Sequence, residues 1–123
     1  MQPDDRDAAY LWDMLRAARD AEEIAEDLTL YSLLEDRKSQ LALSKALELI
    51  GEAADHLSQP FFDARPDLQW EPIINLRHRL VHDYGRTNFR ILWSIVTDEL
   101  PDLITRLKQL LDEVGESEPD IQV

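Results

Sequence analysis

Cysteine is absent from this sequence of 123 residues, and glycine is scarce. Without cysteine the chain can form neither a disulfide framework nor a thiolate metal site, and nothing indicates an oxidising compartment. The three glycines are far apart in the sequence, which excludes a glycine-rich phosphate-binding loop. We therefore expect a cytoplasmic protein that is not held together by disulfides.

Long apolar runs are also missing. Residues 1–7 are mostly polar and acidic and lack the apolar segment of a secretion signal, and no later apolar run exceeds a few residues. We therefore expect neither secretion nor a membrane span. The length fits one domain, and 44% apolar residues can fill one modest core. We expect a helical domain over residues 1–114 and a flexible acidic tail over residues 115–123.

Positive charge is scarce and unevenly placed. The chain has 13 basic and 26 acidic residues, a net charge of −13 that should repel a polyanion at long range. Residues 77–90, however, contain four arginines and one acid, a local charge of +3, together with two of the three histidines. An ordinary solvated helix face could have the same composition. The sequence thus describes an acidic body with one basic segment, made of Arg77, His78, Arg79, His82, Asp83, Arg86 and Arg90.

Three segments have the apolar spacing of amphipathic helices. Apolar residues recur every three or four positions over residues 5–27, 38–57 and 88–114, and Asn88 can cap the last of these helices. Pro101 must kink or restart the last of these helices, because proline cannot donate a backbone hydrogen bond. The Ser32-x-x-Glu35 pattern has the form of a capping box and predicts a helix start or a short helical turn.

Prolines delimit a further helix. Pro60 ends the second long helix and begins a connector to Asp67, whose aromatic residues we expect to cap the core. Pro72 suits the first turn of a helix over residues 71–83, which Gly85 would end. No segment alternates as a strand does. The predicted fold class is therefore all-α, an up-and-down bundle of about four main helices with short extra helical turns.

The segment from Asn75 to Gly85 contains most of the groups that could do chemistry. Internal cleavage of RNA needs a group that exchanges a proton near neutral pH and cations that stabilise the charged phosphorane. His82 could exchange the proton, while Arg77 could bind the non-bridging oxygens. The same residues could equally be a surface arginine and a histidine stabilised by a helix C-terminus.

Helical geometry restricts this hypothesis. Arg77 and His82 are five residues apart, which puts them about 140° apart around a regular helix. Arg77 and Tyr84, seven residues apart, would share one face. Either the helix loosens near Tyr84 and Gly85, or a second subunit helps to complete the site.

A metal site is the competing interpretation of the two histidines. His78 and His82 are four residues apart, a usual spacing for two imidazole ligands of one metal. No third ligand is suitably placed, and Arg77 and Arg79 would repel a cation. We therefore expect neither a metal nor another cofactor.

The Arg77-x4-His82-x-Tyr84 pattern resembles the signature of the HepT-like proteins of the HEPN superfamily. The resemblance covers about residues 5 to 113, and further landmarks are similar to that family in the same order. They lie at residues 35–38, 49–53, 70–74 and 93–101.

The resemblance implies a helical homodimer whose motifs meet at the interface, acting as a metal-independent endoribonuclease toxin. Arg77 and His82 would be the catalytic pair. His78 and Arg79 would support the site, and which of the two histidines moves the proton stays open. Glu52 matches a recurrent acidic position with a role at the site or the interface.

Tyr84 matches the tyrosine to which a minimal nucleotidyltransferase antitoxin attaches AMP in similar proteins. Each added nucleotide brings negative charge to the place where an RNA phosphate must bind. The resemblance therefore implies a type VII-like toxin–antitoxin pair, as a homodimer or in a larger complex with the antitoxin. Two alternatives stay open: a catalytically silent HEPN module that binds a nucleotide or partners a nucleotidyltransferase, and a plain helical dimerisation protein.

Overall fold

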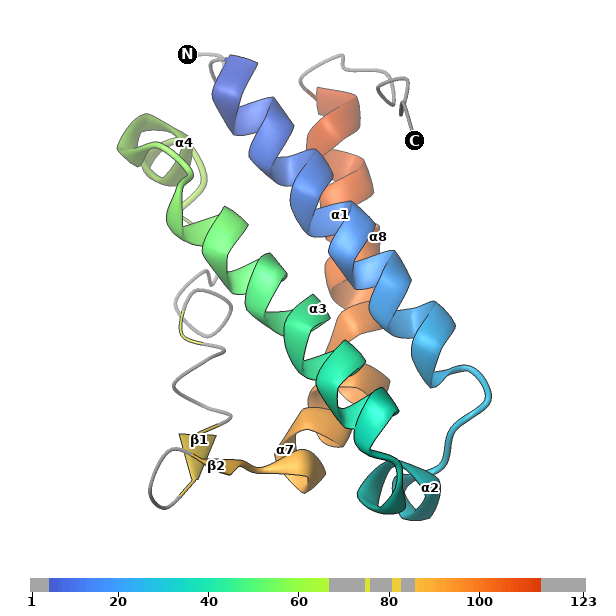
Figure 1. The fold of residues 1–123 in the computed structure, drawn as a ribbon. Helices are drawn as coiled ribbons and strands as arrows, with labels where there is room; N and C mark the ends of the chain where they lie inside the picture. The colour runs from blue at the N-terminus through green and yellow to red at the C-terminus, as the bar shows by residue number, and fades with distance from the viewer. Residues whose placement is uncertain (1–4, 67–74, 76–80, 83–85, 114–123) are drawn as a thin grey trace.

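The computed structural model describes residues 5–66, 75, 81–82 and 86–113, and the side chains of 6–66, 75 and 87–113 (Figure 1). Three long helices form the body: α1 (Asp5–Ala25), α3 (Arg37–Asp55) and α8 (Leu100–Glu113). The α1 helix packs against both α3 and α8. The predicted all-α bundle is confirmed. The expected tail over residues 115–123 lies outside the described residues.

Short elements occupy the two ends of this body (Figure 1). The helices α2 (Leu30–Glu35) and α7 (Phe89–Ser94) lie at one end, and α4 (Gln59–Asp63) lies at the other. A two-residue strand β1 (Val81–His82) pairs antiparallel with β2 (Arg86–Thr87) near α7. The predicted helix over residues 71–83 is therefore wrong at Val81 and His82, which are extended. The rest of that helix, apart from Asn75, lies outside the described residues.

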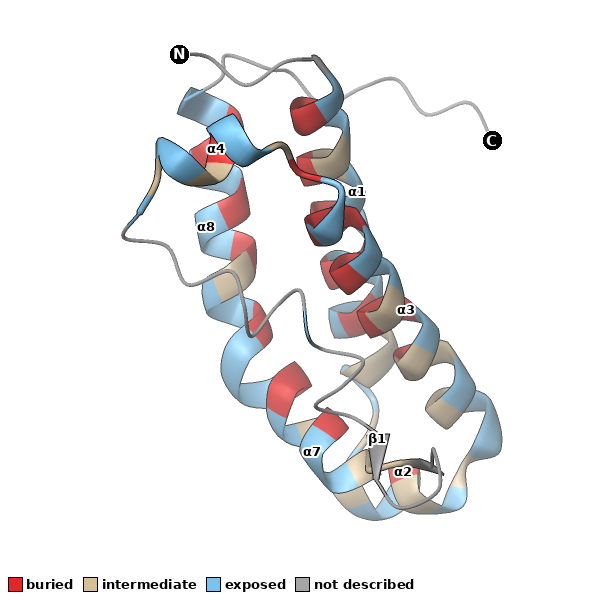
Figure 2. Cartoon of the chain, turned by 90° about the vertical axis from the view of Figure 1, so that its left-hand side faces the viewer, coloured by how far each residue is buried: buried red, intermediate tan, exposed pale blue. Residues whose placement is uncertain are grey.

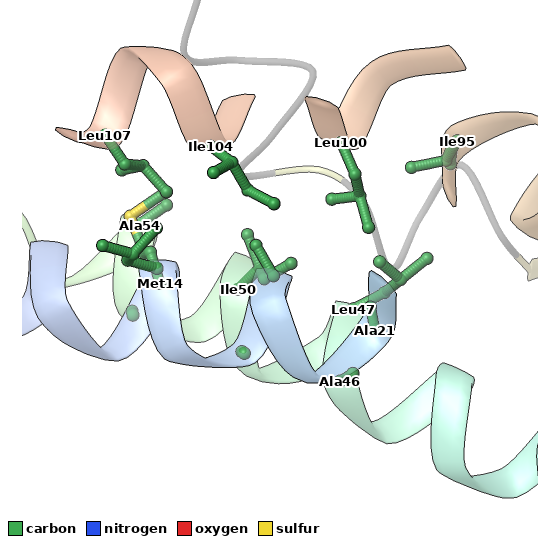
Figure 3. Packing of buried hydrophobic residues seen from close by; sticks show 14 of the residues in the cluster. Met14, Ala21, Ala46, Leu47, Ile50, Ala54, Ile95, Leu100, Ile104 and Leu107 are labelled. Atoms are coloured by element: carbon green, nitrogen blue, oxygen red, sulfur yellow. The ribbon is translucent and has the colours of Figure 1, made fainter. Parts of the chain in front are cut away.

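The core consists of the apolar stripes that the sequence predicts. In Figure 2 the residues coloured as buried lie along the sides of α1, α3 and α8 that face one another, and they belong to one apolar cluster. In Figure 3, Leu107 and Ile104 of α8 point toward Met14, Ile50 and Ala54 of the other two helices. Each fully buried leucine or isoleucine contributes roughly 1.5–3 kcal/mol relative to an exposed one. This burial supplies the main driving force for folding.

The start of α2 differs from the prediction. The Ser32 amide donates to Thr29 Oγ1 (3.1 Å), and the Thr29 amide donates to Ser32 Oγ (2.8 Å). This reciprocal pair is a capping box in which Thr29 is the N-cap and Ser32 takes the third helical position. The helix therefore begins at Leu30, because Ser32 completes the cap and does not start it.

Asp36 caps α3 immediately after α2 ends. Its carboxylate accepts hydrogen bonds from the Ser39 hydroxyl (2.7 Å) and the Lys38 amide (3.1 Å). The bond from Ser39 is the main cause that lowers the pKa of Asp36 below its ordinary value. Gln40 Nε2 donates back to the carbonyls of Leu33 and Leu34 (3.0 and 3.1 Å). These bonds fix the end of α2 to the first turn of α3.

The interruption predicted at Pro101 is confirmed as a π-helical turn, η2 (Ile95–Glu99), between α7 and α8. The Leu100 amide donates to the Ile95 carbonyl, five residues back. Such a turn displaces carbonyls from their usual partners. Within this segment the Thr97 hydroxyl donates to the Trp93 carbonyl, four residues back, at 3.0 Å.

A buried carboxylate fixes the opposite end of the bundle. Asp7 on α1 is 2% exposed, and it accepts hydrogen bonds from the Ser58 amide (2.8 Å) and hydroxyl (2.6 Å). Ser58 is also the N-cap of α4 and accepts from the Phe61 amide (3.3 Å). Phe61 is buried in the core, as expected of the aromatic residues in this connector. The pair Asp7 and Ser58 thus joins α1 to α4.

Replacing Asp7 with alanine should lower the free energy of unfolding by about 2–3 kcal/mol, because both Ser58 donors lose their acceptor. Urea denaturation followed by circular dichroism measures the change. The control is D27A, since Asp27 is an exposed aspartate in the turn after α1. Equal stability of the two variants would contradict a structural role for the Asp7–Ser58 contact.

Candidate functional site

The predicted motif lies mainly in the part of the chain that the structure leaves undescribed. Arg77, His78, Arg79 and Tyr84 all fall outside the described residues. The backbone of His82 is described, and it is the second residue of β1. Because this backbone is extended, the helical angle expected between Arg77 and His82 does not apply. Helical geometry therefore does not require a second subunit to complete the site.

The strand pair places one further basic residue beside the motif. In the antiparallel register, Val81 is the partner of Thr87 and His82 is the partner of Arg86. Residues directly opposite in such a pair are each other's nearest cross-strand neighbours. The sequence places Arg86 in the basic segment, and the register gives it a definite position opposite the histidine.

The second strand leads directly into a capped helix. Asn88 follows β2, and its side-chain oxygen accepts hydrogen bonds from the amides of Arg90 and Ile91, both at 3.1 Å. The predicted cap at Asn88 is thereby confirmed. Leu92 of α7 is buried in the core, and α7 contacts both α2 and α3. The strand that pairs with His82 is thus attached through Asn88 to a well-packed helix.

Glu52 is the one predicted site residue whose side chain is described. It is exposed on α3 and lines an open groove of about 400 Å³ between α1 and α3. Asp13, Asp20 and Arg16 of α1 also line this groove, together with Leu49 of α3. Three carboxylates against one guanidinium make the groove unfavourable for an RNA phosphate.

His56, which the prediction left out of the site, lies in the same groove. Its Nδ1 is 2.7 Å from the Glu52 carbonyl oxygen, and because a carbonyl only accepts, Nδ1 carries the proton. Its ring also lies 5.2 Å from the ring of Tyr10. His56 is the C-cap of α3, where a histidine commonly bonds a terminal carbonyl. Its position four residues after Glu52 was the available sequence signal.

A second groove, of about 610 Å³, lies between the end of α1 and the α7–η2 segment. Arg19, Glu22 and Glu23 of α1 and Glu26 of the following turn line one side, and Trp93 and Thr97 line the other. Its carboxylates also oppose phosphate binding. Neither groove therefore favours the binding of an RNA phosphate. Positive charge is instead concentrated in the basic segment, which contains β1 and β2.

Within the described ranges, no three histidine or carboxylate side chains are grouped so that they could hold a metal ion. The alternative ligand pair includes His78, which lies outside these ranges. None of the helices described is long and apolar enough to cross a membrane.

Comparison with known proteins identifies the family. Residues 14–110 match the model of the family described as "Ribonuclease HepT-like". The chain belongs to the HepT-like ribonuclease family of the HEPN superfamily. The match includes the whole Arg77-x4-His82-x-Tyr84 segment, so it covers the part of the chain that carries the motif.

Several relatives span nearly the same length. A Methanocaldococcus jannaschii protein named "Putative RNase" is 33% identical over 114 residues, covering 92% of this chain and 94% of the relative. The "Probable ribonuclease HepT" of Thermococcus cleftensis is 32% identical over 101 residues, covering 82% and 92%. A "Putative RNase" of Caldanaerobacter subterraneus is 28% identical over 104 residues, covering 85% and 93%. No solved structure gives a significant match.

Glu52 gives a test of whether the α1–α3 groove has a structural role. Because the Glu52 side chain is exposed, E52Q should change the free energy of unfolding by no more than about 0.5 kcal/mol. Urea denaturation measures this, with the D7A variant as the destabilised reference. A loss of more than about 1 kcal/mol would mean that Glu52 maintains the fold, and a loss of activity in E52Q could then not be assigned to the site.

Proposed function

We propose that this HepT-like ribonuclease is the toxin of a type VII-like toxin–antitoxin pair and cleaves RNA without a metal. The observation that carries the proposal is the family match over residues 14–110, which contains every residue of the motif. The position of β1 adds support, because it puts His82 at the end of the bundle where positive charge collects.

The proposed reaction uses the ribose itself as the nucleophile. A histidine, His82 or His78, takes the proton from the 2′-hydroxyl, and the 2′-oxygen forms a bond to the adjacent phosphorus. Arg77 stabilises the charge on the non-bridging oxygens of the phosphorane, with Arg79 in support. The bond to the 5′-oxygen then breaks, and that oxygen takes up a proton. The products are a 2′,3′-cyclic phosphate and a 5′-hydroxyl end.

A homodimer is part of this proposal. Leu41 and Leu49 on α3 are 54% and 41% exposed, and Glu52 is also exposed on this helix. Covering exposed apolar side chains with a partner removes them from water and lowers the free energy of the complex. A second copy would cover them and bring Glu52 to the interface. A complex that also contains the antitoxin would be larger.

The proposed control acts at Tyr84. The partner, a minimal nucleotidyltransferase, would transfer AMP from ATP to the Tyr84 oxygen and release pyrophosphate. The new phosphodiester places a negative charge two residues from His82, where it opposes an RNA phosphate. A single AMP group on Tyr84 could thereby silence the enzyme.

Arg77→Ala and His82→Ala should each lower the RNA cleavage rate at least a hundredfold and remove growth inhibition on induced expression. Gel analysis of RNA treated with purified protein measures the rate, with and without EDTA. The control is R106A, which removes an exposed arginine on α8. We expect EDTA to have no effect on the wild type.

Two outcomes would contradict separate parts of this proposal. Full activity of both the Arg77 and the His82 variants would mean that the catalytic residues lie elsewhere. An inactive wild type would instead favour the alternative function, a catalytically silent module that binds a nucleotide or partners a nucleotidyltransferase.

Co-expression with a minimal nucleotidyltransferase should raise the intact mass by AMP-sized increments. Y84F should prevent the increase, because phenylalanine lacks the acceptor oxygen. Y31F is the matched control, since Tyr31 is the most exposed tyrosine with a described side chain. An unchanged mass pattern in Y84F would exclude Tyr84 as the acceptor.

A further inference from the structure

Three elements meet at the end of the bundle that carries β1 and β2. The short helix α2 contacts both α3 and α7, and α7 also contacts α3. Figures 1 and 2 both place α2, α7 and β1 at this end, away from α4. Exposed aromatic and cationic side chains come from all three helices here. We call them the end surface: Tyr31 of α2, Arg37 and Lys38 of α3, and Arg90 of α7.

Tyr31 is the most exposed large hydrophobic residue whose side chain is described, at 82%. The helix that carries it is nevertheless held firmly. The Thr29–Ser32 capping box fixes its start, and Gln40 of α3 bonds two carbonyls near its end. A ring exposed to water on a fixed support is the arrangement that proteins use to stack an unpaired nucleic acid base.

The three cations of the end surface are exposed to solvent, and Arg37 makes one long hydrogen bond, from Nη1 to Gln40 Oε1 (3.4 Å). Arg37, Lys38 and Arg90 are exposed, and none forms a salt bridge with another described residue. The carboxylate of Asp36 is already occupied by the Lys38 amide and the Ser39 hydroxyl. Residues 30–38 and 86–91 together contain four basic and two acidic residues, a net +2 in a chain of −13.

The end surface is continuous along the chain with the motif. Arg86, the register partner of His82, begins β2, and Asn88 then caps the helix that carries Arg90. A strand of RNA lying across β1 and β2 would therefore meet Arg90 next, followed by α2. The acidic groove between α1 and α3 would repel the same strand.

We propose that the end surface binds the single-stranded RNA next to the cleaved bond, with Tyr31 stacking on a base and Arg37, Lys38 and Arg90 holding phosphates. This inference rests on the proposed ribonuclease function and extends it to substrate capture. It predicts a preference for unpaired RNA, because a base inside a duplex cannot reach the Tyr31 ring.

The test measures RNA binding separately from cleavage. In the His82→Ala background, which should bind RNA without cutting it, Y31A should weaken the affinity for a fluorescent single-stranded RNA about five- to a hundredfold. Y31W should restore it, because tryptophan also stacks. R37Q, K38Q and R90Q should each reduce the slope of log affinity against log salt by about 0.7. K108Q, which removes an exposed lysine on α8, should leave both quantities unchanged.

Several results would overturn the inference. If Y31A and the three charge variants bind RNA as tightly as their parent does, the end surface is excluded as the RNA site. A change in oligomeric state or in association with the nucleotidyltransferase, with RNA binding unchanged, would show that Tyr31 contacts a protein. If the wild type binds RNA but does not cleave it, and Y31A weakens that binding, the proposed ribonuclease function fails while the RNA-binding site stands. In an active enzyme, Y31A should raise KM more than it lowers kcat.

Discussion

Ala18, Ala21 and Ala54 are completely buried where α1 packs against α3, and the remaining architecture depends on this close contact. Side chains of this size let two helix backbones approach, while Met14 and Ile50 fill the space toward α8. The contact then determines where each end of α3 lies. One end receives α2 and α7, and the other is followed by Ser58, which Asp7 holds against α1. The basic end thus has a fixed position on an acidic body.

The same packing divides the surface by charge. Carboxylates line both grooves along α1, whereas exposed cations gather where α2, α3 and α7 meet. These two regions have complementary effects on a polyanion. The grooves exclude it from the sides of the bundle, and the basic end can retain it beside β1.

The sequence patterns correctly predicted the elements that are stabilised by residues close together in the chain. The apolar stripes, the Asn88 cap and the interruption at Pro101 were all correct, because each depends on side chains within a turn or two. The start of α2 was missed because a serine can be either the N-cap or the third residue of a capping box. In this chain Thr29 is the N-cap, so Ser32 is the third helical residue. The strand at His82 was missed because a two-residue pair has no alternating pattern and depends on Arg86 and Thr87, which come later in the chain. The motif was predictable only by resemblance, since arginine and histidine on a helix also occur for structural reasons.

The net charge of −13 makes RNA binding sensitive to the negative charge that the proposed modification of Tyr84 would add. At physiological ionic strength charges are screened over about 8 Å, so RNA near the basic end is influenced mainly by charges in that region. Residues 30–38 and 77–91 together contain six basic and three acidic residues, a net +3, and a margin this small can be overcome by few added negative charges. On a strongly basic ribonuclease, one added phosphate would be a minor perturbation. On this acidic chain each phosphate proposed for Tyr84 would cancel a large part of the local attraction, while the acidic body would oppose RNA binding elsewhere. In this proposal the scarcity of positive charge makes the enzyme selective and also easy to silence.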